Sequence, residues 1–202
     1  MTSYSRCRES FRVGCDIMDL YIALIHHPVV NKKGVVICSA ITNLDLHDIA
    51  RAARTYGVKG YYVVNPLEDQ KILASQVVRH WTEGSGGAIN PARREAFGIV
   101  RLVDSLDDAL EDIGRETEGP VRLVATSARP SPKSVTFTEM REKMTGEGPV
   151  LLLFGTAWGM SDELLDRADY LLEPVRGPGD YNHLSVRSAV TVILDRLLAN
   201  GR

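Results

Sequence analysis

Three polar side chains in the first third of the chain recur at helical spacing and could act on a charged or hydroxyl-bearing substrate. His47, Arg51 and Arg54 lie four and three residues apart, which places them on one stripe of a helix. Arginine keeps its proton at ordinary pH, so such a stripe could bind phosphate or stabilise developing negative charge rather than accept a proton. For a lone arginine, a solvated helix face is the commoner explanation.

Three further segments combine glycine, proline and small polar residues directly after predicted strands. They are residues 126–129 (TSAR), 155–160 (GTAWGM) and 173–185, the last rich in proline and glycine. Such residues let backbone approach a ligand closely, and ligands bind outside the carboxyl ends of parallel strands. Tight turns explain the composition equally well. None of the segments has the glycine pattern of a Rossmann dinucleotide site or a P-loop.

The elements that must position these residues alternate between strand and helix. Apolar runs predict strands at residues 20–25, 34–40, 61–64, 99–103, 122–125, 150–154 and 170–172. Helical periodicity predicts helices at residues 46–56, 68–83, 106–113, 137–144 and 190–198. Asn43 or Asp45 should cap the first helix, Gly57 should end it, and residues 84–91 should form a glycine-rich loop. The alternation predicts an α/β fold, with a mostly parallel sheet and helices on both faces.

Composition and length predict one globular domain. The chain has 202 residues, 44% of them hydrophobic and 25% charged. Because Met18 directly precedes the first strand, we expect residues 1–17 to be a disordered or extraneous leader and residues 18–202 to be the domain. No apolar run approaches the ~20 residues that a membrane span needs. The three cysteines lack CxxC spacing, which argues against disulfides and a metal site and favours the cytoplasm.

The last third of the chain carries a family resemblance. Residues 154–175 (FGTAWGMSDELLDRADYLLEPV) and 179–198 (GDYNHLSVRSAVTVILDRLL) resemble the second and third motifs of SPOUT-class RNA methyltransferases. From Leu20 onward, about nine-tenths of the chain, the sequence is similar to a bacterial RNA methyltransferase family, some of whose members are fused to a tRNA guanine-N1 methyltransferase. The resemblance implies a C-terminal trefoil knot, a homodimer, and S-adenosyl-L-methionine (SAM) as methyl donor, with S-adenosyl-L-homocysteine as product.

The same resemblance implies that the three small-residue segments form the SAM pocket, mostly through backbone amides and carbonyls. The residues at the motif positions are Thr126, Ser127, Phe154, Gly155, Thr156, Gly159, Leu172, Pro174, Asn182, His183, Leu184 and Ser185. Asn182 or Ser185 could also cap the last helix, and both roles are compatible.

A second match, in residues 44–66, resembles the ribose 2′-O methyltransferase branch of the class. That branch has an arginine six residues before a helix-ending glycine, followed by a strand that ends in VNP. Arg51, Gly57 and residues 62–66 reproduce this spacing. The chain departs from the branch in two ways. Asp45 stands where Asn is usual, with Asn43 two residues earlier, and the glutamate after the FG of the second motif is missing.

The resemblance assigns Arg51 to the acceptor side of the reaction. Methyl transfer from a sulfonium needs an aligned acceptor and a dry site, and Arg51 could hold the acceptor and stabilise its developing charge. His47, His26 or an RNA phosphate oxygen could accept the proton, and Asn43 completes the candidate catalytic set. The lead hypothesis is ribose 2′-O methylation of tRNA or rRNA. The alternatives are a base methyltransferase and a SAM-binding regulatory module without turnover.

RNA affinity has to come from local contacts, because the formal net charge is −2. The basic positions expected to contribute are Lys32, Lys33, Arg93, Arg94, Arg129 and Lys133. No membrane, DNA or metal partner is expected. The broad apolar face of the C-terminal helix suits a dimer interface or its own core equally well. Trp158, beside the glycines of the second segment, could pack under the cofactor or in a subunit contact.

Overall fold

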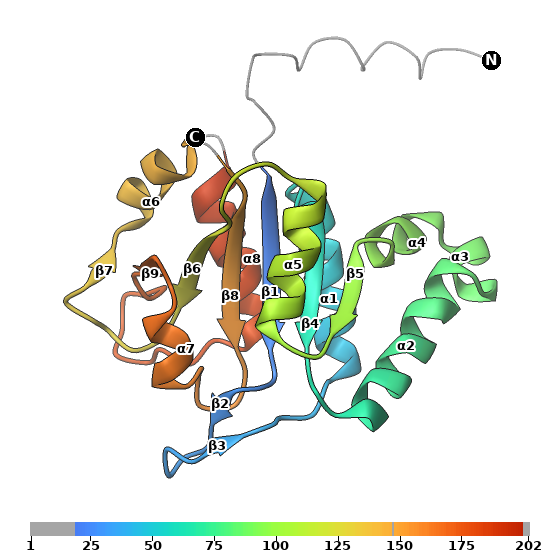
Figure 1. Ribbon diagram of the computed structural model, residues 1–202, viewed down its shortest axis with the longest axis horizontal. Coiled ribbons are helices and arrows are strands. Elements are labelled where there is room, and N and C mark those ends of the chain that lie inside the picture. Colours follow the sequence, from blue (N-terminus) through green and yellow to red (C-terminus); the bar gives the residue numbers. More distant parts are fainter. Residues whose placement is uncertain (1–18, 147, 200–202) are drawn as a thin grey trace.

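Parallel strands form the centre of the molecule, as Figure 1 shows for this computed structural model. The structure describes residues 19–146 and 148–199, so the expectation about residues 1–17 lies outside the described part. The sheet order is β5-β4-β1-β8-β6-β9-β7, and every pairing in it is parallel, which confirms the predicted sheet. The strands are β1 (Leu20–Ile25), β4 (Gly60–Val64), β5 (Val100–Val103), β6 (Arg122–Thr126), β7 (Ser134–Val135), β8 (Val150–Gly155) and β9 (Tyr170–Leu172). The trefoil knot stays a prediction.

Helices cover both faces of the sheet, as the sequence predicts. Alternate residues of β1 point to opposite faces, so Leu20, Ile22 and Leu24 enter one core cluster while Tyr21, Ala23 and Ile25 enter the other. The first face carries α1 (Asn43–Thr55), α6 (Phe137–Met144) and α8 (Val186–Leu198), and the second carries α5 (Leu106–Glu116) and α7 (Asp162–Asp166). Central strands are buried on both sides, which explains their unbroken apolar runs.

A helical unit lies beyond β5, at the edge of the sheet (Figure 1). It comprises α2 (Glu68–Thr82), α3 (Ser85–Ile89) and α4 (Pro91–Phe97). The predicted loop over residues 84–91 is therefore wrong. Gly86 and Gly87 serve close helix packing instead, since a Cβ at Gly87 would lie 2.1 Å from the Trp81 carbonyl oxygen. In α2, Leu73 is 58% exposed, so the predicted apolar face packs only in part.

A short hairpin replaces most of the strand predicted over residues 34–40. Only Val36–Ile37 (β3) is paired, antiparallel to Val29–Val30 (β2), in a separate two-stranded sheet. The Asn31 side chain forces the tight reversal, because its Oδ1 accepts hydrogen bonds from the amides of Lys33 and Val35.

The helix carrying Arg51 is capped by a residue that the sequence analysis did not select. Thr42, not Asn43 or Asp45, is the N-cap of α1. Its hydroxyl accepts from the Asp45 amide and donates to the Asp45 carboxylate at 2.6 Å. At α8 the expected alternative Ser185 is the cap, since its hydroxyl accepts from the Ser188 amide.

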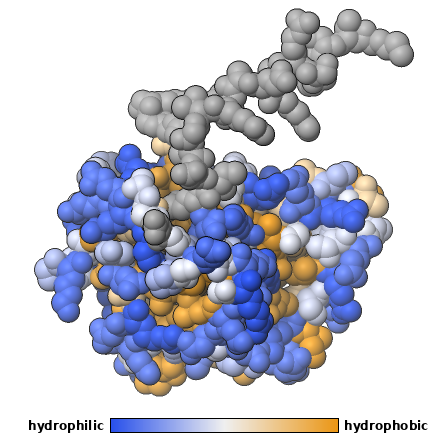
Figure 2. Space-filling view, turned by 45° about the horizontal axis from the view of Figure 1, so that its top comes forward, coloured by the Kyte–Doolittle hydropathy of each residue, from blue (hydrophilic) through white to orange (hydrophobic). Residues whose placement is uncertain are grey.

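Polar residues cover most of the face seen in Figure 2, and hydrophobic residues gather across its middle. Within residues 19–146 and 148–199, no helix is both long and apolar enough to span a bilayer.

The space around Gly87 in α3 and Gly114 in α5 predicts opposite effects when each is replaced by alanine. Gly87→Ala should destabilise the protein by about 1–3 kcal/mol, because its methyl group overlaps the Trp81 backbone. Gly114→Ala in α5 should be neutral or stabilising by up to about 1 kcal/mol, since nothing lies within 4 Å of that Cβ. Urea denaturation measures both, and equal effects of the two substitutions would contradict the packing argument.

Candidate functional site

The three small-residue segments meet at the carboxyl edge of β6, β8 and β9, which are neighbours in the sheet. Two hydrogen bonds join them directly. Arg129 of the first segment donates to the carbonyl of Trp158 in the second at 3.2 Å. The Asn182 side chain of the third donates to the carbonyl of Ala128 in the first at 3.0 Å. The expected pocket segments therefore form one surface, although they are far apart in the sequence.

The second segment, after β8, folds back tightly on itself. A Cβ at Gly155 would lie 2.8 Å from the amide nitrogen of Met160, so only glycine fits there. Gly159 and Ala157 have φ values of 109° and 50°, in the left-handed region that favours glycine. Residues this small leave backbone groups accessible, which fits a ligand held mainly by amides and carbonyls, as the resemblance implies for SAM.

The candidate pocket residues divide into two groups by burial. Phe154, Leu172 and Pro174 are buried, so they form the floor beneath the exposed residues. Leu184 is 49% exposed and His183 is also exposed, with its ring 5.3 Å from that of Tyr181 in an edge-on arrangement. Thr126 donates its hydroxyl to the Leu153 carbonyl at 2.8 Å, and the Ser127 hydroxyl accepts from the Arg129 amide. The first segment is therefore fixed to β8 at its base.

A partly buried hydrogen-bond chain anchors the second segment from below. Thr156 donates its hydroxyl to the Ile25 carbonyl at 2.9 Å and lies 2.6 Å from the Ser39 hydroxyl. Ser39 in turn lies 2.9 Å from Nδ1 of His26, which is fully buried at the end of β1. The sequence analysis missed Ser39, because the approach to α1 carries no motif that marks it.

The direction of this chain follows from counting protons. The only hydroxyl proton of Thr156 goes to Ile25, so Ser39 must donate to Thr156 and His26 Nδ1 must donate to Ser39. His26 therefore carries a proton on Nδ1. Its Nε2 has no hydrogen-bond partner in the described part of the chain. Burial lowers the pKa of His26 to about 4, against a smaller opposing effect of Asp45.

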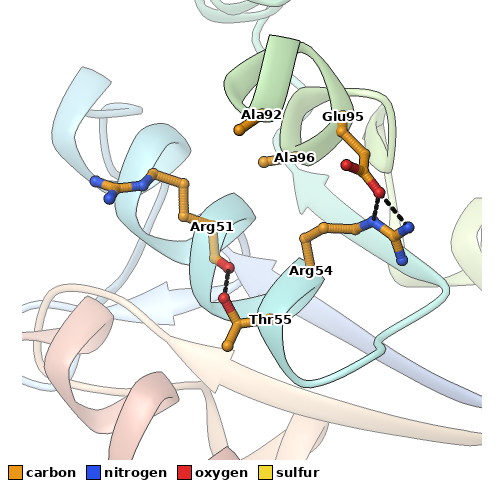
Figure 3. Close-up of a pocket in the computed structure, with 6 residues that line it drawn as sticks. All are labelled: Arg51, Arg54, Thr55, Ala92, Glu95 and Ala96. Atoms are coloured by element: carbon orange, nitrogen blue, oxygen red, sulfur yellow. Dashed lines mark hydrogen bonds and ion pairs between the residues drawn. The ribbon is translucent and has the colours of Figure 1, made fainter. Parts of the chain in front are cut away.

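The two α1 arginines differ in how they are held, as Figure 3 shows. Both line a cleft of about 420 Å³ between α1 and α4. Arg54 forms an ion pair with Glu95 of α4. Arg51 is exposed, points away from Arg54, and has no acidic partner among the described residues. Arg51 is thus the α1 arginine that remains free to meet a substrate.

His47 does not share the solvated stripe expected for it. Its ring packs edge-on against Phe97 at 4.7 Å and Trp81 at 5.4 Å, between α1 and the helical unit. Burial, with a contribution from the Arg93 charge, lowers its pKa. The prediction that His47 shares a solvated stripe with Arg51 and Arg54 is therefore wrong. Packing against two aromatic rings explains His47 without a catalytic role. Trp81 is partly buried and packs against the first core cluster.

Asp45, at the position where the ribose branch usually has Asn, lies in an ion pair that the sequence analysis missed. It is 6% exposed and accepts from Nη1 of Arg187 at 3.4 Å, while Arg187 Nε approaches Asp48 at 3.5 Å. Arg187 follows the third pocket segment directly, so this pair connects that segment to α1. Asn43 is exposed one residue after the cap and lines a groove of about 210 Å³ with Gln70 and Leu73 of α2.

Within one chain, Arg51 does not lie among the pocket segments. The helix α1 starts at the carboxyl edge and runs toward the opposite edge (Figure 1). At 1.5 Å per residue, Arg51 lies about 12 Å along the axis from Asn43.

Comparison with known proteins places the chain in a family. A family described as SAM-dependent RNA methyltransferase matches residues 19–199. A tRNA (guanine-N(1)-)-methyltransferase from Oleidesulfovibrio alaskensis is 45% identical over 91% of this chain, but the chain spans only 43% of that relative. TrmJ from Pectobacterium atrosepticum, a tRNA (cytidine/uridine-2′-O-)-methyltransferase, is 30% identical over 77% of this chain and 62% of the relative.

Solved structures support the fold. The SpoU methyltransferase AviRb from Streptomyces viridochromogenes, in complex with AdoMet, has a TM-score of 0.59 at 18% identity. The match covers 93% of this chain and 59% of AviRb. The mostly parallel α/β fold expected from the sequence is thereby confirmed.

The hydrogen-bond chain predicts that removal of the Ser39 hydroxyl lowers both the stability of the protein and its affinity for SAM. Ser39→Ala should cost about 1–3 kcal/mol of unfolding free energy, because it leaves the His26 Nδ1 donor unpaired. It should also weaken SAM binding, since Thr156 loses a partner. Ser75→Ala is the control, because its hydroxyl makes an exposed bond to Ile72 and should cost at most about 0.5 kcal/mol. Denaturation and calorimetric SAM titration measure both, and a silent Ser39→Ala would refute the bracing role.

His26 predicts a pH dependence of stability. Its folded pKa of about 4 lies below the ordinary histidine value of 6.5, so between these two pH values the unfolded state binds more protons. The part of the unfolding free energy that comes from neutral His26 should be lost as pH falls from 6.5 toward 4, by about 1.4 kcal/mol per pH unit. His26→Gln should remove this component of the slope in urea titrations. If that variant fails to fold, nitrogen NMR of the wild-type imidazole must still show a protonated Nδ1, and a protonated Nε2 instead would contradict the chain.

Proposed function

The chain belongs to the SAM-dependent RNA methyltransferase family, and we propose that it transfers a methyl group from SAM to the ribose 2′-hydroxyl of a tRNA nucleotide. The observation that carries the proposal is Arg51, which keeps the spacing of the ribose branch and lies exposed in the α1–α4 cleft without an ion-pair partner in the described residues. The similarity to TrmJ, whose name specifies 2′-O transfer on tRNA, supports the choice of acceptor.

In this proposal the three segments at the carboxyl edge hold SAM, which supplies an electrophilic methyl group. Backbone groups around Gly155, Thr156 and Gly159 bind and orient it, and the tight second segment excludes water from that side. Arg51 holds the acceptor nucleotide and stabilises the charge that develops on its 2′-oxygen. Bound SAM would supply the methyl group by breakage of its S–CH₃ bond as the O–CH₃ bond forms and the 2′-hydroxyl loses its proton, with S-adenosyl-L-homocysteine as the leaving product.

The structure bears on the choice of proton acceptor. His26 is fully buried and occupied with Ser39, and His47 is held between aromatic rings. Burial also lowers the pKa of both imidazoles, which reflects how far the fold encloses them. Of the three candidate proton acceptors, we therefore assign the RNA phosphate oxygen, which receives the proton and then passes it to solvent.

We further propose a cytoplasmic homodimer in which Arg51 serves the partner's pocket. The support is geometric, since Arg51 lies about 12 Å along α1 from the edge that holds its own pocket segments. An acceptor residue placed in this way is available to a pocket that another subunit brings to it.

Labelled SAM gives a direct test of the reaction. The protein is incubated with labelled SAM and total bacterial tRNA and rRNA, and the RNA is digested to nucleosides. A labelled 2′-O-methyl nucleoside from tRNA is the expected product. A labelled base would favour guanine methylation, the activity in the name of the longer relative. SAM binding without any labelled nucleoside would favour a regulatory module that binds SAM without turnover.

Substitution of Arg51 should separate acceptor chemistry from cofactor binding. Arg51→Ala should lower kcat by roughly 10²–10³-fold with SAM affinity unchanged, because the residue acts on developing charge. Arg54→Ala, which breaks the pair with Glu95, should lower it far less. Single-turnover methylation and SAM titration distinguish the two, and retained turnover in Arg51→Ala would refute its role.

Mixing two inactive variants tests the shared site. Arg51→Ala subunits keep a pocket, while Gly155→Val subunits should lose SAM binding because a side chain there meets Met160. Co-refolded mixtures should regain a substantial fraction of wild-type activity if Arg51 acts across the interface. No regain, despite dimers shown by light scattering, would place Arg51 and the pocket in one subunit.

A further inference from the structure

The β2–β3 hairpin braces the second pocket segment through its backbone. The amide of Val30 donates to the Gly159 carbonyl at 2.9 Å, and the amide of Trp158 donates to the Val30 carbonyl at 3.1 Å. Val29 also forms an antiparallel bridge with Met160. The hairpin is thus a direct extension of the wall of the candidate SAM site, and it projects beyond the carboxyl edge of the sheet (Figure 1).

The turn of this hairpin presents two lysines to solvent. Because the Asn31 side chain accepts from two amides of the turn, the backbone that carries Lys32 and Lys33 is held in place. Both lysines are exposed, and neither forms a salt bridge within the described residues. Their charges are therefore not neutralised by the protein itself, although the chain as a whole has a net charge of −2.

Exposed apolar side chains adjoin these charges. Val35 and Val36 of the hairpin are 56% and 50% exposed, and Trp158, on the segment that the hairpin braces, is 53% exposed. Arg129 reaches the same segment, because its guanidinium donates to the Trp158 carbonyl. Lys32, Lys33, Val35, Val36, Arg129 and Trp158 together form what we call the hairpin surface. The acidic residues that are nearest to Trp158 in the sequence, Asp162 and Glu163, lie in the first turn of α7.

We infer that the hairpin surface binds an unpaired stretch of the RNA substrate next to the methyl donor. The three cations contact backbone phosphates, and Trp158 stacks on a base, which is the combination that single-stranded RNA uses. The inference rests on the proposed function for its substrate. A second copy of the chain is the poorer partner, because a symmetric contact would bring these unneutralised cations toward their own copies.

The test measures affinity for bacterial tRNA by fluorescence anisotropy over a series of salt concentrations. Lys32→Ala/Lys33→Ala should weaken binding at least about tenfold at low salt. It should also reduce the slope of log affinity against log salt by roughly 1.4 to 1.8, the value for two lost phosphate contacts. Trp158→Ala should weaken binding roughly five- to a hundredfold with the slope unchanged, and Trp158→Phe should restore most of it.

The matched control removes two positive charges from the opposite edge of the sheet. Lys59→Ala/Arg115→Ala breaks pairs with Asp19 and Glu111 and should bind tRNA as the wild type does. Far-UV circular dichroism and urea denaturation verify that every variant is folded. A lysine variant with the affinity and salt slope of this control overturns the inference, as does loss of dimers in the lysine variant with RNA affinity retained.

The outcome separates this inference from the proposed function. Loss of affinity in the lysine variant, while the wild type transfers no methyl group, supports the hairpin surface and rejects the function. Full affinity in the lysine variant, while the wild type methylates tRNA, rejects the hairpin surface and leaves the function standing. A wild-type protein that binds no RNA overturns both.

Discussion

The candidate site depends on the hydrogen-bond chain from His26 through Ser39 to Thr156. This chain joins the end of β1, the segment that leads into α1, and the turn after β8, which are distant in the sequence. Because the Thr156 proton is committed to Ile25, each member has one possible direction of donation, and a proton on Nδ1 of His26 follows. Burial lowers the pKa of His26 and so leaves its Nε2 without a proton at neutral pH.

Parallel strand order provides the second constraint. Since β8, β6 and β9 are adjacent and parallel, the segments that follow them must emerge at one edge. Small residues then allow these segments to approach one another, and Arg129 and Asn182 join them. The acceptor side is connected separately, through the pair between Arg187 and Asp45. The proposed cofactor and acceptor residues thus lie on different elements, which agrees with the proposed site shared between two subunits.

Much of this arrangement could be predicted from the sequence, because buried parallel strands and strand-following glycine segments leave clear local patterns. Pairings across long separations leave none. Nothing near Ser39 marks its partnership with Thr156, and the charge of Asp45 gives no sign of Arg187. The prediction of a loop over residues 84–91 was wrong for a related reason. Gly86 and Gly87 allow α2 to pack closely and do not mark a turn. His47 looked solvated by spacing, yet the helical unit beyond β5 covers it.

The central claim is that three segments at the carboxyl edge form the SAM site, the second of them held by the hydrogen-bond chain from His26. Hydrogen–deuterium exchange with and without SAM tests it most directly, because backbone amides are expected to hold the ligand. The account predicts that SAM slows exchange in residues 126–129, 155–160 and 173–185, with a smaller effect around Ser39. Protection confined to the cleft between α1 and α4, with those three segments unchanged, would contradict it.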